Sequence, residues 1–144
     1  MSQLSASWLL WALLSAAFAA LTAIFAKLGV ADIPSDLATL IRTGVILMLV
    51  AAIAFATGQW RSPSTIPGRA WLFLVLSGLA TGASWLCYFR ALKLGDAARV
   101  APVDKFSVVL VAIFGVLLLG ERLSAAATLG VVLIAAGAAL VALG

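Results

Sequence analysis

The sequence predicts an all-α integral membrane protein with five transmembrane helices, and three observations support that fold class. Of the 144 residues, 65% are hydrophobic and only 10% are charged, and the mean hydropathy is +1.24. A soluble domain is about 45–50% apolar and about 25% charged, so lipid must solvate most of these side chains. Each crossing of a core about 30 Å thick needs about 20 residues, which leaves room for about five helices. The apolar runs are long and rich in Ala and Leu, whereas a membrane β-barrel would alternate in pieces of about 10 residues.

The composition also limits the possible chemistry. Cys87 is the single cysteine and histidine is absent, so we expect no intramolecular disulfide, no metal site and no histidine-based triad. We therefore predict that the protein is not an enzyme and uses no cofactor. The net charge of +4 comes from basic residues scattered along the chain. These residues suit a lipid surface and indicate no nucleic-acid partner.

Residues 1–144 are predicted to form one transmembrane domain with short connections. The segment from Met1 to Ser7 contains no Lys or Arg, so we expect the first apolar run to be a permanent helix rather than a signal peptide. Ser35 or Asp36 is expected to cap the second helix, and Ser124 the fifth. The expected helices cover about residues 8–27, 36–57, 70–93, 97–119 and 124–143.

The start of the fourth helix decides which charges enter the membrane. The uncharged run from Phe106 to Leu119 has 14 residues, or about 21 Å, which is too short for a core of about 30 Å. A spanning helix must therefore begin near Ala98 and bring Pro102 into the membrane. Because Pro102 has no backbone N–H, we expect a kink or break there, with carbonyls that can face a cavity. A re-entrant or tilted short segment is the alternative.

Three charged residues, Arg42, Asp104 and Lys105, are expected at one depth in the membrane. Arg42 and Lys105 each precede the end of their helix by about 15 residues, or about 22 Å. Their helices enter from the same side because two crossings separate the two starts. Charges at this depth are costly and usually face a bundle interior or a water-filled cavity. They could form an ion pair that fixes helix packing, bind an anion or zwitterion, or reach the surface along their long side chains.

If the three charges form a binding site, the third helix adds polar and aromatic groups to it. Its polar residues recur at helical spacing in one stripe, which can line a pathway or simply hydrogen-bond to other helices. Arg90 lies near the membrane edge, where it can reach the surface or contribute at the mouth of a cavity. The predicted substrate-binding residues are Arg42, Ser84, Trp85, Tyr88, Arg90, Pro102, Asp104 and Lys105.

The last helix contains a candidate contact between helices. Gly130 and Gly137 are seven residues apart and lie on one face after about two turns. Small residues at such positions allow close approach of two helices. The contact could serve the interior of one chain or the interface of two, and we favour a homodimer interface.

Several segments together resemble a known family. The stretch from Tyr88 to Pro102, the "LLLGERLS" turn that contains Glu121 and the closing "LGVVLIAAGAALV" segment resemble the EamA domain of the drug/metabolite transporter superfamily. Arg42 within the second helix also fits this family. The resemblance covers nearly the whole chain, and it indicates the short form with one five-helix repeat, since typical members carry two repeats in ten helices. It implies transport of small metabolites.

The closing helix also looks like the dimerising helix of the small multidrug resistance family, a relative with four helices. That family places an essential glutamate in its first helix for proton coupling. The first helix of this chain has no carboxylate, which argues against drug/proton antiport by that mechanism. Asp104 is the deep carboxylate that could couple transport to protons.

We therefore predict a multi-pass transporter of a bacterial-type inner membrane whose substrate is a small, anionic or zwitterionic metabolite. Transporter sites usually lie between two repeats, so a homodimer, antiparallel or parallel, would supply the second repeat for alternating access. The expected partners are the lipid bilayer, the substrate and a second copy. The alternatives are a channel or passive pore, and a structural or regulatory membrane subunit without transport.

Overall fold

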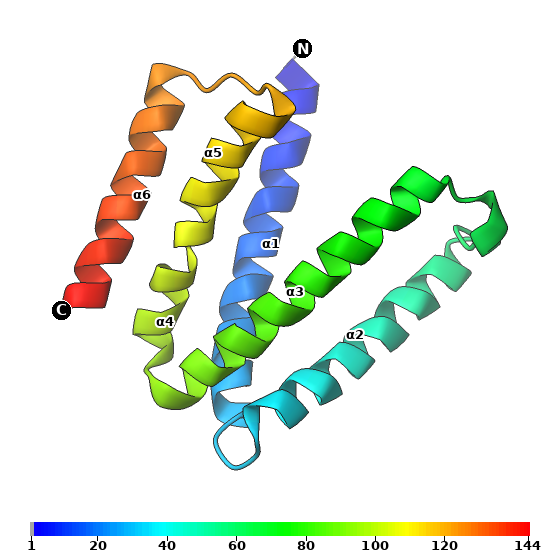
Figure 1. Cartoon of the computed structure of the whole chain (residues 1–144), viewed down its shortest axis with the longest axis horizontal. Helices are drawn as coiled ribbons and strands as arrows, with labels where there is room; N and C mark the ends of the chain where they lie inside the picture. Colours follow the sequence, from blue (N-terminus) through cyan, green and yellow to red (C-terminus); the bar gives the residue numbers. More distant parts are fainter. Residues whose placement is uncertain (1) are drawn as a thin grey trace. The chain divides into compact units, whose positions relative to one another are not determined.

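The computed structural model describes residues 2–144, with side chains from Trp8 onward, and this part of the chain forms six α-helices and one short 3₁₀-helix (Figure 1). Five segments are long and apolar enough to cross a membrane, because α4 and α5 together make one crossing. The predicted all-α class and the five transmembrane helices are therefore confirmed. The elements are α1 (Ser2–Gly29), α2 (Ser35–Ala56), η1 (Pro63–Thr65), α3 (Gly68–Leu94), α4 (Ala97–Asp104), α5 (Phe106–Leu119) and α6 (Ala125–Leu143).

Local turn chemistry fixes the junction between α5 and α6. Gly120 ends α5 with a φ of 69°, a left-handed conformation that glycine adopts without steric cost. Ser124 caps α6, because its Oγ accepts a hydrogen bond from the Ala127 N–H at 3.2 Å. The predicted cap by Ser124 is confirmed, and the junction between the two crossings is correspondingly short.

The start of α2 differs from the prediction. The N-cap is Pro34, which offers no side-chain acceptor, and Ser35 is already the first helical residue. The predicted cap by Ser35 or Asp36 is therefore wrong. The helix begins one residue earlier than that cap requires, and the Asp36 carboxylate instead forms an ion pair with Arg90 of α3.

The fourth crossing is broken at Lys105, between α4 and α5. Pro102 lies inside α4 and has no N–H, so the Ala98 carbonyl lacks its ordinary donor four residues later. The Lys105 N–H instead donates to the Pro102 carbonyl, three residues back, at 3.0 Å. The break expected at Pro102 thus falls at the end of the following turn. The whole crossing, Ala97–Leu119, has 23 residues, which is about 34 Å and long enough to span.

Two compact units divide the chain. Unit 1 contains Met1–Ala23 and Leu94–Gly144, and unit 2 contains Ile24–Lys93. In unit 1, α6 packs against both α4 and α5. In unit 2, α2 and α3 run antiparallel as a hairpin that is joined by the loop containing η1 (Figure 1).

The buried residues of unit 2 gather at one end of this hairpin. We name residues 26–42 and 85–93 the turn end, and residues 53–73, around the connecting loop, the loop end. Between residues 43 and 84 no side chain is buried, so the outer parts of α2 and α3 expose apolar side chains that lipid can solvate. The buried residues of the turn end are Ala26, Val30, Ala38, Thr39, Phe89 and Leu92.

Candidate functional site

Arg42 of α2 lies against two aromatic rings of α3. Its guanidinium carbon is 4.1 Å from the centroid of the Trp85 ring and 5.5 Å from that of Phe89. The two rings are four residues apart, so they share one face of α3. Phe89 is only 2% exposed and its ring is held by the core of the turn end. A guanidinium within about 6 Å of an aromatic face is stabilised by the quadrupole of the ring.

The hydrogen-bonding capacity of Arg42 is not used within unit 2. A guanidinium has five N–H donors and no acceptor, and no oxygen among residues 24–93 accepts a hydrogen bond from it. The Trp85 and Phe89 rings are therefore the contacts that the described part of unit 2 gives to the guanidinium. Arg42 therefore places a half-buried positive charge inside the crossing Ser35–Ala56, where an unpaired charge is costly.

Ser84 and Tyr88 lie next to this aromatic pair on α3. They are four residues apart and form the stripe adjacent to that of Trp85 and Phe89. Ser84 is exposed and Tyr88 is half-buried. The predicted residues Arg42, Trp85, Tyr88 and Ser84 thus belong to one part of unit 2, and they combine one cation with aromatic and hydroxyl groups.

Asp36 and Arg90 form a bidentate ion pair that the sequence analysis did not predict. Arg90 Nη2 is 2.9 Å from Asp36 Oδ2, and Arg90 Nε donates to Asp36 Oδ1 at 3.2 Å. Both side chains are more than half exposed. The planar fork of a guanidinium matches a carboxylate in this geometry. Arg90 is therefore bound to the start of α2. This differs from both arrangements expected from the sequence, in which Arg90 reached the membrane surface or contributed to the mouth of a cavity.

Two lysines also tie the helix ends of the turn end together. Lys93 Nζ donates to the Ile33 carbonyl at 2.6 Å, and Lys27 Nζ donates to the Leu92 carbonyl at 2.7 Å. The Leu92 carbonyl belongs to the last turn of α3, where carbonyls lack intrahelical donors and carry partial negative charge, so an ammonium group is favourable there. The Ile33 carbonyl lies in the turn before α2. These contacts fix the end of α3 beside the turn that leads into α2.

A single register explains the contacts across the hairpin. Asp36 and Arg90 are equally far from Pro63 along the sequence, and so are Ile33 and Lys93. For Arg42 and Trp85 the midpoint in sequence falls half a residue later. An antiparallel hairpin folded at η1 brings such pairs to equal heights. The ion pair could therefore have been predicted from the position of the loop, because opposite charges at equal sequence distances from the loop face each other in an antiparallel hairpin.

The remaining predicted site residues belong to unit 1. Asp104 and Lys105 contact each other, with Lys105 Nζ 3.3 Å from Asp104 Oδ2. They are neighbours in sequence at the break between α4 and α5, and both remain partly exposed. Pro102 is half-buried one turn earlier. Among the residues with described side chains, no group of three or more His, Cys, Asp or Glu could hold a metal ion.

Gly130 and Gly137 lie on α6 in unit 1. A Cβ atom built at either position would meet no atom within 4 Å, apart from neighbouring residues and the backbone of the helix itself. This face of α6 is therefore open within the described chain. A small-residue face without a neighbour leaves room for a second helix.

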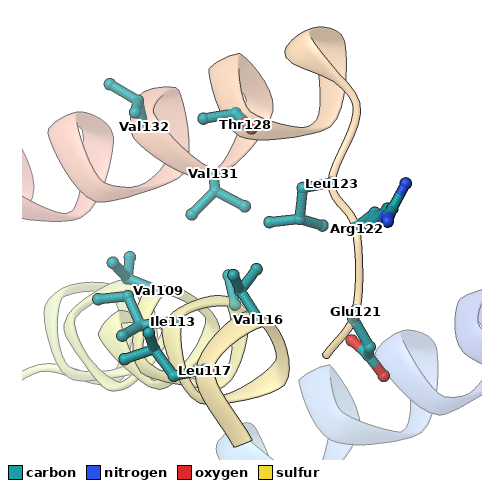
Figure 2. Close-up of a pocket in the computed structure, with 11 residues that line it drawn as sticks. Val109, Ile113, Val116, Leu117, Glu121, Arg122, Leu123, Thr128, Val131 and Val132 are labelled. Atoms are coloured by element: carbon teal, nitrogen blue, oxygen red, sulfur yellow. The ribbon is translucent and has the colours of Figure 1, made fainter. Parts of the chain in front are cut away.

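Unit 1 also contains an open groove between α5 and α6, with a volume of about 760 Å³ (Figure 2). Its walls are apolar, and Figure 2 shows Leu123 of the connecting segment directed into the space between the two helices. Glu121 and Arg122 lie at the same end, where their side chains point apart from each other. The main wall residues are Val109, Ile113, Val116 and Leu117 of α5, and Val131 and Val132 of α6.

Comparison with known proteins identifies the chain as a membrane transporter. Residues 6–143 match the EamA-like transporter family, so the chain belongs to this family and is a multi-pass membrane transporter rather than an enzyme. A relative from Sinorhizobium sp, described as "Uncharacterized transporter in cobO 3'region", is 74% identical over 139 residues, which make up 96% of this chain and 99% of that protein. No solved structure matches the chain. The resemblance read from the sequence is confirmed.

Proposed function

We propose that the protein moves a small anionic or zwitterionic metabolite across the membrane by alternating access, and that Arg42 binds the negative group of this substrate. The supporting observation is the half-buried guanidinium of Arg42, which lies 4.1 Å from the Trp85 ring and donates to no oxygen of unit 2. A charge inside a membrane normally has a partner or faces water. A carboxylate or phosphate group of the substrate would supply the missing acceptor in bidentate geometry.

The neighbouring residues take complementary roles in this proposal. Trp85 holds the guanidinium in place at 4.1 Å, so that little side-chain entropy is lost when the substrate binds. Ser84 and Tyr88 offer hydroxyl groups to the polar parts of the substrate. Arg90, bound to Asp36, positions the end of the hairpin and through it the height of Trp85.

In unit 1 the break after Pro102 supplies a second set of groups. Pro102 leaves a carbonyl without its helical donor. In this proposal Asp104, whose Oδ2 lies 3.3 Å from Lys105 Nζ, takes up a proton or binds an amine. We assign proton coupling to this acid, because it is the carboxylate that lies within the crossing Ala97–Leu119.

The working unit in this proposal is a homodimer through α6. Gly130 and Gly137 have no neighbouring side chain within 4 Å of a built Cβ, so a second helix can approach. Gly130→Leu or Gly137→Leu should reduce the yield of crosslinked dimer in native membranes, measured with a crosslinking reagent that does not react with cysteine. Ala136→Leu, on another face of α6, is the matched control and should not. Crosslinking unchanged in all three variants would contradict the dimer contact.

A ligand-binding experiment tests the role of Arg42. The purified protein in detergent is screened by thermal shift against amino acids, carboxylic acids and phosphorylated metabolites. We expect at least one anionic or zwitterionic compound to raise the melting temperature, since a ligand that binds the folded state stabilises it. Arg42→Gln should remove this shift and Arg61→Gln, in the exposed loop, should preserve it. An equal shift in Arg42→Gln would overturn the assignment.

Flux measurements separate alternating access from a passive pore. In vesicles that contain the protein, the compound found by thermal shift should accumulate against its own gradient when a gradient of the coupling ion is imposed. A pore would only equilibrate the compound. Accumulation that never exceeds equilibrium under proton or sodium gradients of either direction would contradict the proposed mechanism.

A further inference from the structure

We propose that the groove between α5 and α6 binds one acyl chain of a zwitterionic phospholipid, whose headgroup lies against Glu121 and Arg122. The groove has a volume of about 760 Å³ and belongs to unit 1. It does not involve Arg42 or any residue of the proposed substrate site. The inference therefore stands whether or not the proposed function is correct.

The walls of the groove suit a hydrocarbon chain. Figure 2 shows Val109, Ile113 and Val116 on α5 facing the space below α6, where Val131 points toward them. These branched side chains have few rotamers and form a fixed surface. Since both helices cross the membrane, the solvent at this surface is lipid, and a chain lying in the groove gains dispersion contacts on two sides.

The length of the groove matches one leaflet of the bilayer. Along α5 its wall runs from Val109 to the residues that follow Gly120, where the crossing ends. Twelve residues of helix correspond to about 18 Å, and half of a hydrocarbon core about 30 Å thick is about 15 Å. An acyl chain that enters at the surface end would therefore reach the bilayer centre near Val109.

The surface end of the groove carries two charges that do not neutralise each other. Neither the Glu121 carboxylate nor the Arg122 guanidinium forms a hydrogen bond or ion pair with a described side chain. Figure 2 shows the two side chains pointing apart. The backbone fixes this arrangement, because the Glu121 N–H donates to the Gly115 carbonyl at 3.0 Å.

Gly115 also makes room for the carboxylate of Glu121. A Cβ atom at position 115 would lie only 2.7 Å from Glu121 Oε2, so the side chain of Glu121 lies close over the last turn of α5. A phosphate group would complement Arg122 and an ammonium group would complement Glu121. A headgroup that carries both charges at adjacent positions, as in phosphatidylethanolamine, fits this pair better than a purely anionic headgroup.

Photocrosslinking with a labelled lipid tests the groove. The protein is reconstituted in phosphatidylethanolamine vesicles containing a small fraction of phosphatidylethanolamine with a diazirine in one acyl chain, and adducts are mapped after irradiation. We expect adducts on the wall residues between 109 and 132. Val116→Phe should fill the groove and lower the adduct yield at least about fivefold, the factor that corresponds to about 1 kcal/mol. Val131→Phe, on the opposite wall, provides an independent second variant.

The matched control is Val111→Phe, a residue of α5 that is 68% exposed and does not line the groove. It should leave the adduct yield unchanged. Equal yields in Val116→Phe, Val131→Phe and Val111→Phe would overturn the acyl-chain site. The acyl-chain site would also be overturned if the wild-type protein gave no lipid adducts and Val131→Cys, in a Cys87→Ser background, formed a disulfide-linked dimer. That result would assign the groove to a second copy of the chain.

Retention of added lipid, followed by native mass spectrometry, tests the headgroup. Arg122→Gln should weaken retention of both phosphatidylethanolamine and phosphatidylglycerol, by no more than about fivefold because the charge is exposed. Glu121→Gln should weaken retention of phosphatidylethanolamine only. Arg61→Gln, in a loop of unit 2, is the control and should change neither. Unchanged retention of phosphatidylethanolamine in both groove variants would contradict the headgroup assignment.

Discussion

The two ends of the α2–α3 hairpin are held by different interactions. The turn end buries Phe89 and Leu92, at 2% and 0% exposure, and adds the ion pair between Asp36 and Arg90. The loop end buries no side chain. Its contacts are a stack of the Phe55 and Trp60 rings at 4.2 Å, a hydrogen bond from Trp71 Nε1 to the Pro63 carbonyl at 3.3 Å, and Arg69 at 5.8 Å from the Phe73 ring.

This difference indicates how the hairpin divides its tasks. Amphipathic rings such as Trp60 and Trp71 are typical of membrane interfaces, where they anchor a segment at the headgroup level without packing against protein. The turn end instead fixes one helix relative to the other, and Arg42 lies just inside this fixed region. The binding groups of the proposed site are thus carried on the rigid end of the hairpin, as accurate positioning requires.

The largest expected effect is a loss of unfolding free energy when a buried side chain of the turn end is truncated, compared with an exposed side chain of the loop end. Leu92→Ala should reduce the free energy of unfolding in detergent by about 2–5 kcal/mol, since it removes a completely buried side chain. Leu72→Ala, on the same helix at 57% exposure, should change it by no more than about 0.5 kcal/mol. Denaturant titration followed by circular dichroism measures both. Losses of similar size would mean that the turn end is not the core of the hairpin.

A smaller effect is expected from the ion pair. Arg90→Gln should lower the melting temperature more than Arg69→Gln, because Arg90 makes two hydrogen bonds to Asp36 whereas Arg69 contacts only a ring face. Salt should shrink the difference, since both partners are exposed. The exchanged pair Asp36→Arg/Arg90→Asp should recover part of the loss. Equal melting temperatures at low salt would contradict a role of the pair in fixing the hairpin.

The smallest effect is expected at the loop end. Trp71→Phe removes the hydrogen bond to Pro63 but keeps an aromatic ring, so the loss of unfolding free energy should not exceed about 1 kcal/mol. The same denaturant titration measures it. A loss comparable to that of Leu92→Ala would show that the loop end contributes to the core as much as the turn end does.

The crossings could be predicted from sequence because their signal is local and strong. Apolar runs of about 20 residues, bounded by Gly, Pro and charged residues, define transmembrane helices directly. The break near Pro102 followed from the missing N–H of proline, but its position at Lys105 did not. The chain completes one more turn with a three-residue hydrogen bond before the helix ends, and the tightness of that turn is not encoded in the proline alone.

The contacts of the site were harder to predict, because they join residues far apart in sequence. The sequence predicted Arg42 and Trp85 as site residues but did not show that the guanidinium carbon lies 4.1 Å from the ring centroid. It also assigned Asp36 to a helix cap, since Ser and Asp at a helix start usually serve there. The actual partner, Arg90, lies 54 residues away and becomes a neighbour only once the loop position sets the register of the hairpin.

Uptake measurements on single and double variants test the central claim, that Arg42 binds the substrate. Arg42→Gln and Asp104→Asn should each abolish uptake of the identified compound into reconstituted vesicles, while both proteins still insert and fold. If Arg42 binds substrate, the double variant Arg42→Gln/Asp104→Asn must also be inactive, because the missing donor is not replaced. If the two residues were only a structural ion pair, removing both would leave no orphan charge. Recovery of wild-type uptake in the double variant would therefore contradict the assignment of Arg42 to the substrate site.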